Sequence, residues 1–561
     1  MKVLLATLCL LFSGAPSWEE ALLVMSGASA VEELDADVLE HYAFYRDHPV
    51  RINSAGRGGL RSCGLLTAYQ VASLLDYRSR HGPVLSLAEL ALVDGFGEEF
   101  TGALSYFIVI DVPQAGRGTG IARKDAGVEA LVRSGLKGAE GEEPRSMLAE
   151  KAVLAIGERF KASAGHSRGY GGEEKASFSA AYSSAGRRWT VLAGDINARF
   201  GQGLALWSGF SLSGVPSVES MSRNPSGVSA SSSFSGAGRP RGVAATADLG
   251  KCTMSALWSS DAKAANLMFF AKSIQGGATF AANSAGSVLS ADFKSFLKPV
   301  DLWGEAAFEP VSRSPAVVLG AGWSPAWKMR VSLLMRYYGP GYRGIFAGGV
   351  RTSTRTSDDA ALSVGFRFGA FSGTGDFSRR PSDGRIQVKS LLAASPSFSV
   401  FSGTLTPSLR LSLRSRPEDD RPLRTDLRGD LDFARGPWQF HARYNTLWYK
   451  SRSWLWYAEA ACGSEGRCVR FRASVRGGIF KVDEWDDRIY VYERDLPGMF
   501  TVPARYGRGW NLSAAGGIRL SGRRFRHSLN FRAGLVAYPW TVPYKPAALE
   551  ARFQYSVSFH D

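Results

Sequence analysis

The chain has 561 residues but no stretch of about eighteen uninterrupted apolar residues, so the sequence predicts no membrane-spanning helix. It has only five cysteines and seven histidines, and the histidines lack the spacing of a metal site. A His-Glu-x-x-His motif, a paired Cys-x-x-Cys motif and a lysine-containing phosphate loop are all missing. We therefore expect a protein that is not an enzyme and uses no cofactor or metal, and the sequence identifies no small-molecule substrate.

The first thirty residues have the pattern of an export signal. Met1 and Lys2 precede a short, largely apolar run over residues 3–12, and small residues with a proline follow at 13–17. A charged start, a short apolar centre and a neck of small residues are typical of a cleavable signal peptide. We predict that residues 1–17 are this signal peptide, with cleavage after residues 28–30 as the alternative, and that the chain is exported.

The end of the chain has the pattern of a strand. Residues 549–559 alternate strictly between apolar and polar side chains. Because successive side chains of a strand point to opposite faces, one face is apolar and the other is polar. The length matches the roughly 9–11 residues that a tilted membrane-spanning strand needs. The same alternation recurs at residues 329–337, 362–368, 409–414, 469–475 and 529–535.

These strands predict a large all-β antiparallel transmembrane barrel over residues 128–561. An open sheet edge would leave unpaired backbone groups in lipid, so the sheet has to close. Arginine repeatedly takes the polar positions, as is common inside a water-filled barrel, and the aromatic residues around 448–457 are typical of an interfacial girdle. Allotting roughly 22–28 residues to each hairpin, we expect on the order of 16–20 strands.

Charge is unevenly divided along the chain. Residues 1–50 contain two basic and eight acidic residues. The whole chain carries +16 and its first 110 residues carry −6, which leaves +22 for residues 111–561. An Arg-rich barrel of this kind favours anions in its lumen or lipid phosphates at its rim. The alternative is that Arg and Lys only keep a wet face solvated.

Residues 31–112 show helical periodicity instead. The pattern predicts a helix over 32–47, a helix start capped by Asn53 or Ser54, a helix over 70–80, a helix capped by Ser86, and a tight turn at 93–97 that opens a fourth. We assign a small all-α domain to residues 31–112. A Gly-rich linker is expected at residues 113–127.

The order of these elements resembles the tandem helix-hairpin-helix module of ComEA-like competence DNA receptors. The resemblance is carried by I-N-S-A at 52–55, D-Y-R-S-R-H-G-P at 76–83, S-L-A-E-L at 86–90 and V-D-G-F-G-E-E at 93–99. In that family a G-x-G turn at a helix N-terminus holds a DNA phosphate. The resemblance implies phosphate contacts from Gly64, Gly95, Gly97, Arg57, Arg61, Arg78 and Arg80.

Two features of this module weigh against DNA as its ligand. The first hairpin, residues 63–66, keeps only one of the two glycines. Asp94, Glu98 and Glu99 surround the second hairpin, where carboxylates repel a phosphate, although they equally suit a helix N-terminus. With five basic and five acidic residues over 51–110 and mostly acidic residues before them, the module also lacks the basic footprint of a strong non-specific DNA binder.

Four segments interrupt the barrel pattern, at residues 193–195, 200–207, 222–227 and 489–498. Together with the head, these segments resemble a family of Bacteroidota envelope proteins that fuse a helix-hairpin-helix head to an outer-membrane β-barrel. The resemblance implies a cell outer-membrane location in contact with lipid, and a head in the periplasm. For the glycine-containing block at 200–207 we favour a bulge or inward fold packed against the wall over a binding loop.

The cysteines suggest one cross-link. Cys462 and Cys468 bracket the tip of a hairpin and are candidates for a disulfide in an oxidising compartment. Cys63 and Cys252 are expected to be buried thiols.

Two functional hypotheses remain open. In the first, the barrel is a transport or DNA-uptake protein and the head grips nucleic acid. In the second, the head is a protein-docking or plug-like element of a structural or secretion-associated barrel whose partners are other envelope proteins. The acidic residues of the head favour the second hypothesis, whereas the family of the head and the Arg-lined barrel favour the first.

Overall fold

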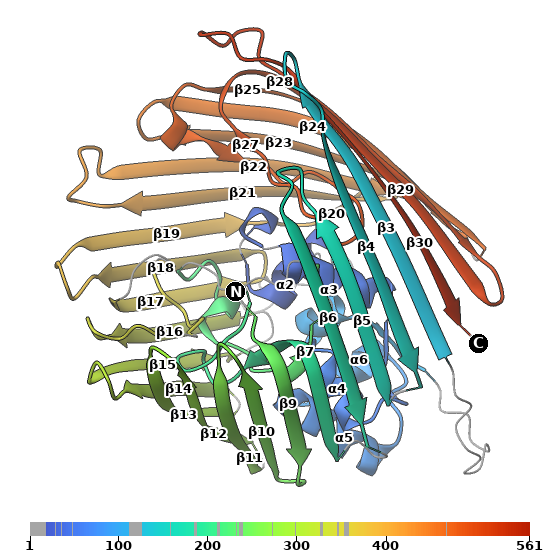
Figure 1. Ribbon diagram of the computed structural model, residues 1–561. Coiled ribbons are helices and arrows are strands. Elements are labelled where there is room, and N and C mark those ends of the chain that lie inside the picture. Colours follow the sequence, from blue (N-terminus) through green and yellow to red (C-terminus); the bar gives the residue numbers. More distant parts are fainter. Residues whose placement is uncertain are drawn as a thin grey trace.

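The computed structural model describes residues 18–560 (Figure 1), apart from residues 29, 35, 48, 112–125, 158, 185–187, 210–213, 232, 235–238, 272, 298, 326–328, 345–346, 353–357 and 467. The predicted signal peptide and nearly all of the predicted linker lie outside the described residues. No helix in the described part is long and apolar enough to cross a membrane. A small helical region precedes one large antiparallel barrel, which confirms the predicted fold class.

The helical head begins earlier than predicted, with a helix just after the predicted signal peptide. Its core contains Leu22, Leu60, Leu74, Leu90 and Phe107, all fully buried. The elements of the head are α2 (Trp18–Ser26), the 3-10 helix η1 (Val31–Glu33), α3 (Ala36–Asp47), β1 (Val50–Arg51), α4 (Arg57–Ser62), α5 (Ala68–His81), α6 (Leu87–Leu92), α7 (Glu98–Leu104) and β2 (Ile108–Val109), which pairs in parallel with β1.

The predicted helix starts have different outcomes. Ser86 caps α6 as predicted, because its hydroxyl accepts the Glu89 N–H. The start predicted at Asn53 or Ser54 is wrong, since α4 begins only at Arg57. The Asn53 side chain instead bonds the backbone of Val84 and Asp111, and so joins three separate turns of the head.

The barrel is a closed antiparallel sheet of 24 strands. Its last strand, β30 (Ala548–His560), pairs with its first, β3 (Ala126–Ala139), so no edge is left open. Two short strands add none to the wall: β8 (Gly227–Ala230) pairs with the end of β7, and β20 (Phe398–Val400) continues the line of β19 along β21. The other strands are β4 (Arg145–Ile156), β5 (Phe160–Arg168), β6 (Glu174–Ser183), β7 (Trp189–Arg199), β9 (Arg241–Asp248), β10 (Cys252–Ser259), β11 (Lys263–Ala271), β12 (Ile274–Asn283), β13 (Gly286–Leu297), β14 (Val300–Glu309), β15 (Ser314–Trp323), β16 (Met329–Tyr338), β17 (Asp359–Phe368), β18 (Phe371–Arg379), β19 (Ile386–Ala394), β21 (Gly403–Ser415), β22 (Leu423–Arg435), β23 (Trp438–Trp448), β24 (Arg452–Glu465), β25 (Val469–Val482), β28 (Gly507–Ser521) and β29 (Phe525–Ala537).

The expectation of 16–20 strands is wrong. A hairpin such as β12–β13, residues 274–297, has the predicted length but contributes two strands. Three long insertions, at residues 200–240, 339–358 and 483–506, then take up much of the remaining chain. All three lie at the end of the barrel opposite the start of β3 and the end of β30, where connections such as 369–370 and 436–437 are short.

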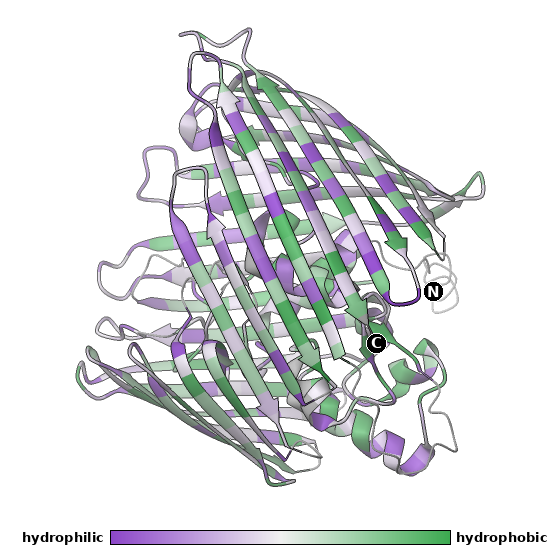
Figure 2. Ribbon diagram, turned by 45° about the vertical axis from the view of Figure 1, so that its right-hand side comes forward, coloured by the Kyte–Doolittle hydropathy of each residue, from purple (hydrophilic) through white to green (hydrophobic). Residues whose placement is uncertain are grey.

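The predicted alternation is confirmed along the strands of the wall (Figure 2). On β16, Leu333 and Met335 are exposed on the outer face, whereas Ser332 and Arg336 are buried inside. A closed sheet with an apolar outer face and a polar inner face satisfies its backbone internally and presents only apolar side chains to lipid. The chain therefore has the fold of an outer-membrane β-barrel.

The head lies within the barrel opening (Figure 1). Glu40 on α3 bonds Lys151 on β4, and Glu99 on α7 bonds Arg367 on β17. In a wall of 24 strands, β4 and β17 lie half the circumference apart, so the head spans the lumen. The insertion 200–240 reaches the head from the far end, where the Ser217 hydroxyl donates to a backbone carbonyl at the end of α2.

Candidate functional site

Acidic side chains of the head meet basic side chains of the barrel wall. In the Glu40–Lys151 pair both side chains are largely buried, so either charge left unpaired there would be costly. One pair has the opposite sense, with the base on the head and the acid at the end of β9. The pairs are Glu33 with Arg410 (3.1 Å), Glu40 with Lys151 (2.8 Å), Glu99 with Arg367 (2.5 Å) and Arg57 with Asp248 (3.4 Å).

The densest contact, which we call the latch, consists of Glu32, Arg428, Asp430, His441 and Arg443. Glu32 accepts a hydrogen bond from Arg428 at 3.2 Å with one oxygen and from Arg443 with the other. Asp430 accepts from the Nε atoms of the same two arginines, at 2.7 Å in the case of Arg428. Each carboxylate therefore faces two guanidinium groups, and every latch side chain is less than one-fifth exposed.

Strand register places the latch residues. Asp430 on β22 lies directly opposite Arg443 on β23. Arg428 and His441 each precede one of these residues by two positions, so all four side chains point to the same inner face. Two adjacent strands thus present a compact charged patch at the height where η1 of the head reaches the wall.

The electrostatics of the latch favour an ionised Glu32. Burial alone would raise the pKa of Glu32, but Arg428 and Arg443 outweigh it and hold the pKa well below its ordinary range. The N–H of Tyr492, from the insertion 483–506, also reaches Glu32 at 3.3 Å. The head, the wall and an insertion from the far end therefore meet at one carboxylate.

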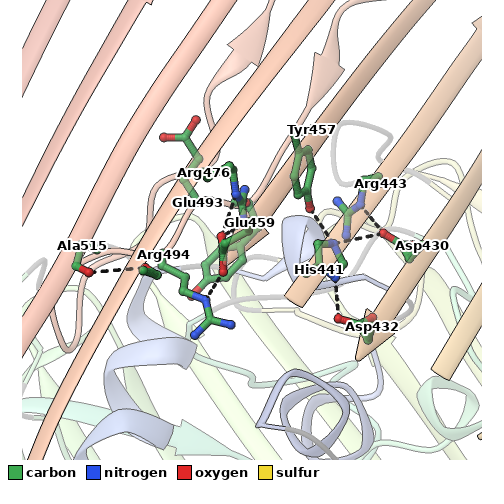
Figure 3. Close-up of polar contacts among 12 residues, drawn as sticks. Asp430, Asp432, His441, Arg443, Tyr457, Glu459, Arg476, Glu493, Arg494 and Ala515 are labelled. Atoms are coloured by element: carbon green, nitrogen blue, oxygen red, sulfur yellow. Dashed lines mark hydrogen bonds and ion pairs between the residues drawn. The ribbon is translucent and has the colours of Figure 1, made fainter. Parts of the chain in front are cut away.

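His441 extends the latch toward a second charged cluster (Figure 3). Its Nδ1 lies 2.5 Å from Asp432, and its Nε2 lies 2.9 Å from the hydroxyl of Tyr457. Beyond Tyr457, Glu459 on β24 bonds Arg476 on β25 at 2.7 Å. A cavity of about 20 Å³ between this cluster and η1 has room for one water molecule.

The acidic and aromatic segment at 489–498 has a wall-anchoring role. Three consecutive charged residues of this insertion each bond a different strand of the wall. They also hold Tyr492 and Phe500 against the hydrophobic core of the head. The pairs are Glu493 with Arg532 on β29 (2.6 Å), Arg494 with Glu459 on β24, and Asp495 with Arg552 on β30.

The glycine-containing block at 200–207 folds inward against the wall, as favoured from the sequence. One oxygen of the buried Glu305 on β14 accepts the backbone N–H groups of Gln202 (2.6 Å) and Leu204 (3.0 Å). Gly201 has a φ of +57°, and a β-carbon there would lie 2.7 Å from the Glu305 carboxylate. Glycine is therefore required for the loop to close on this acid.

The described residues among those predicted to contact DNA have different surroundings. Both hairpin turns contain glycines with positive φ, but a β-carbon on Gly64 would lie 3.4 Å from the His41 ring, and the Gly95 carbonyl accepts from the Gln70 side chain. Only Gly97 borders open space.

The predicted arginine partners of DNA are engaged in different places. Arg57 bonds Asp248 of the wall, and Arg78 donates to two backbone carbonyls within the head. Arg80 pairs with Asp76 on an exposed face. The side chain of Arg61 lies outside the described residues.

The cysteines predicted to form a disulfide are both free. Cys462 lies opposite Ala473 in the register, so it is displaced along the hairpin from Cys468. Cys63 is buried as expected, and burial raises the pKa of its thiol to about 11, whereas Cys252 is only partly buried. Among the described residues, no group of three or more His, Cys, Asp or Glu side chains is placed to hold a metal ion.

Sequence reasoning missed the residues that join the head to the wall. Glu32 and Arg443 are 411 positions apart, so no local pattern connects them. One signal was present: an acidic N-terminal segment precedes an Arg-rich barrel.

No family model matches the sequence. No curated protein matches it. Among solved structures, the P pilus usher (PapC) translocation pore is similar with a TM-score of 0.38 and 10% identity, over 78% of this chain and 99% of that chain. OccK5 (OpdH) of Pseudomonas aeruginosa is similar with a TM-score of 0.32 and 9% identity, over 78% and 98% of the respective chains. These likenesses are too distant to assign a function.

Proposed function

We propose that this chain is an outer-membrane barrel whose lumen is closed by its own N-terminal head, so that a solute passes only when the head shifts or leaves. The latch supports this most directly, because it places Glu32 of the head between Arg428 and Arg443 of the wall. Removing one partner of a buried ion pair is strongly destabilising, so a plug held in this way stays docked until other interactions compensate.

The size of the barrel supports the same proposal. Barrels of about 16–18 strands enclose an aqueous channel, and transporters of about 22 strands hold a plug in the lumen. This wall has 24 strands, more than its own side chains fill. The basic inner face and the acidic start of the head are electrostatically complementary.

The connections suggest an orientation in the envelope. Outer-membrane barrels have short periplasmic turns and longer extracellular loops. The three long insertions are at the end opposite β3 and β30, so we assign the terminal end, through which the head enters, to the periplasm. We also propose membership of the Bacteroidota family described above, supported by the helix pairs α4–α5 and α6–α7 preceding a barrel in one chain.

Conductance in a planar bilayer tests the plug. The wild-type protein should conduct little. Glu32→Lys places a third positive charge beside Arg428 and Arg443, and should shift the docking equilibrium by about a hundredfold or more. The matched control is Asp76→Lys, which makes the same change on an exposed face of α5.

A cross-link makes the test specific for the head. A β-carbon on Gly27 would lie 3.5 Å from that of Ser220, within the range for a disulfide. In a background without the native cysteines, Gly27→Cys with Ser220→Cys should keep the Glu32→Lys variant closed until a reductant is added. High wild-type conductance, or Glu32→Lys conductance that the oxidised cross-link leaves unchanged, contradicts the plug.

DNA binding, the alternative that the helix-hairpin-helix resemblance implies, requires a released head. In the docked head, Arg57 and Glu99 bond the wall and Arg78 bonds backbone carbonyls. Duplex DNA should therefore bind the Glu32→Lys variant more tightly than the wild type, with an affinity that falls as salt rises. Absence of binding in both proteins rules out DNA as a ligand, and equal binding in both would mean that DNA binding does not depend on release of the head.

A further inference from the structure

A cavity of about 270 Å³ separates the head from the wall on the side of β4 to β9. Its volume far exceeds the 10–15 Å³ or so that one water needs, so it accommodates a small solute. Helix α3 forms one side with His41, Phe44 and Tyr45. The inner face of strands β5, β6, β7 and β9 forms the other, and β8 covers the end away from the chain termini.

The wall leaves this space because its side chains are small. Lys161 on β5 lies between Ala155 on β4 and Ala181 on β6 in one row across the strands. In the next row toward the terminal end, the hydroxyls of Ser183 and Thr190 bond each other at 3.0 Å. Alanines and short hydroxyl side chains on either side of a lysine produce a hollow with a positive centre.

The acids around the cavity form ion pairs, whereas Lys161 forms none within the part of the chain that the structure describes. Glu40 bonds Lys151 at 2.8 Å, and Asp248 pairs with Arg57, so both acids are neutralised by cations outside the cavity lining. Lys161 instead places its ammonium 4.1 Å from the centre of the Phe44 ring. It forms no ion pair within the described residues.

Two more basic side chains line the cavity: Arg159, at the rim, and Arg239, which donates to the Ser231 hydroxyl. The positive charges of this region also act on His41 of α3. Burial, together with the charges of Arg199, Lys161 and Arg239, lowers the pKa of His41 to about 3. The imidazole is therefore neutral at ordinary pH and adds no further positive charge.

Polar groups with spare hydrogen-bonding capacity complete the lining. The Oδ1 atom of Asn197 is buried and accepts no hydrogen bond among the described residues. Ser226, Ser229 and Ser231 contribute hydroxyl groups nearby, and Tyr45 contributes an aromatic face. Basic groups at one place, acceptors and hydroxyls at another, and aromatic surface between them are the features of a site for an organic anion.

We propose that this cavity binds a small organic anion, with its carboxylate or phosphate at Lys161 and Arg239 and its hydroxylated body toward Asn197. Such an anion contacts the head and the wall at once, so it stabilises the docked head. This proposal rests on docking of the head, as the proposed function does, but not on gating.

Calorimetry on the full-length protein in detergent tests the site. The probes are inorganic phosphate and succinate, with glycerol as the neutral control. We expect at least one anion to bind and glycerol not to bind. Lys161→Gln should weaken binding at least tenfold, because a charged hydrogen-bond donor is lost. Arg330→Gln, which removes another lumen-facing cation paired with Asp301 on a distant part of the wall, should change it less than twofold.

A second variant separates loss of charge from loss of fold. Ala181→Phe fills the cavity and retains every cation, and it should also abolish anion binding. Absence of heat with both anions, or binding that survives Lys161→Gln and Ala181→Phe, overturns the site.

In the cross-linked Gly27→Cys, Ser220→Cys protein the head stays docked. If the cross-linked protein binds an anion and the wild type has high conductance, the anion site is supported and the plug is contradicted. If the wild type conducts little and no anion binds, the plug is supported and the anion site is contradicted.

Discussion

The head meets the wall in two different ways. On the side of β22 and β23, Glu32 lies in a closed network with Arg428 and Arg443, and the space left is about 20 Å³. On the side of β4 to β9, α3 faces a cavity of about 270 Å³ lined by Lys161. The head thus pairs the arginines of the latch on one side of the lumen, whereas on the other side it pairs Lys151 but leaves Lys161 without an ion pair among the described residues.

The two sides therefore have different roles: the latch holds the head in place, and the cavity binds a solute. Paired buried charges fix the position of the head, since each charge that loses its partner is left in a poorly solvated site. A cation such as Lys161, which forms no ion pair among the described residues and lies beside a hollow, instead attracts a solute. We infer that the latch fixes the position of the head in the lumen, and that the cavity determines which solute stabilises the docked head.

Removal of the central guanidinium of the latch should have the largest effect. Arg443→Met leaves Glu32 and Asp430 with one fewer cation, and should weaken docking by about 3–5 kcal/mol. Hydrogen exchange of α2 and α3 amides measures this. Arg380→Met, which removes an exposed arginine paired with Asp383, is the matched control and should leave their protection unchanged. Unaltered exchange in Arg443→Met would mean that the latch does not hold the head.

The insertion 200–240, whose strand β8 covers one end of the cavity, should be the next most sensitive point. Gly201→Ala adds a β-carbon close to the Glu305 carboxylate at a φ of +57°, and should destabilise the insertion 200–240 by about 1–3 kcal/mol. Protease sensitivity of the insertion reports this loss. Gly250→Ala has a similar backbone strain (φ +85°) but nothing within 4 Å, so it should destabilise its own turn by less. Equal sensitivity of the two sites would remove the role assigned to Glu305.

Acid should distinguish the two sides by their titrating groups. The pKa of His41 falls to about 3 in the docked head, below its ordinary value of about 6.5. The neutral form is favoured by docking, so this contribution is full above pH 6.5 or so and is lost as pH falls toward the docked value. Glu32, whose docked pKa is also lowered, adds a loss only below about pH 4.3.

The test is the pH dependence of head protection between pH 7 and 5. The wild type should lose about 2 kcal/mol of docking free energy over this range. His41→Gln should lose markedly less, because it has no imidazole to protonate. A steep dependence that persists in His41→Gln would place the titrating group elsewhere.

The exposed face of the head should show the smallest effect. Arg80 pairs with Asp76 one turn earlier on α5, and both side chains are more than half exposed. Such pairs contribute about 0.3–0.5 kcal/mol. Arg80→Ala should therefore leave docking, measured by exchange of α3, within error of the wild type. A larger change would reveal a third contact surface on the head.

The sequence predicted the elements of this fold better than their assembly. Alternation along residues 329–337 predicts a strand with one apolar face because the period of two is a local property, and β16 confirms it. The cap at Ser86 is equally local. Asn53 failed as a cap because its side chain has partners at Val84 and Asp111, far along the chain.

The candidate site depends on contacts that no window of the sequence contains. Arg428 and Glu32 are separated by 396 positions, and their meeting requires a closed barrel with a head inside it. The sequence shows an acidic start and a charge of +22 over residues 111–561, which we interpreted as favouring anions in the lumen or lipid phosphates at the rim, or as keeping a wet face solvated. The structure shows that part of this charge is matched by the head itself.

Closure of the wall between its first and last strands has a consequence for biogenesis. Arg133 on β3 bonds Gln554 on β30, 421 positions later in the chain, so this seam forms only after β30 has been synthesised. Contacts of such long range form slowly. The head precedes β3 and is therefore finished while the sheet is still an open ribbon. We expect the ribbon to curl around a preformed head, in which case a chain lacking residues 18–111 would close its barrel more slowly than the intact chain.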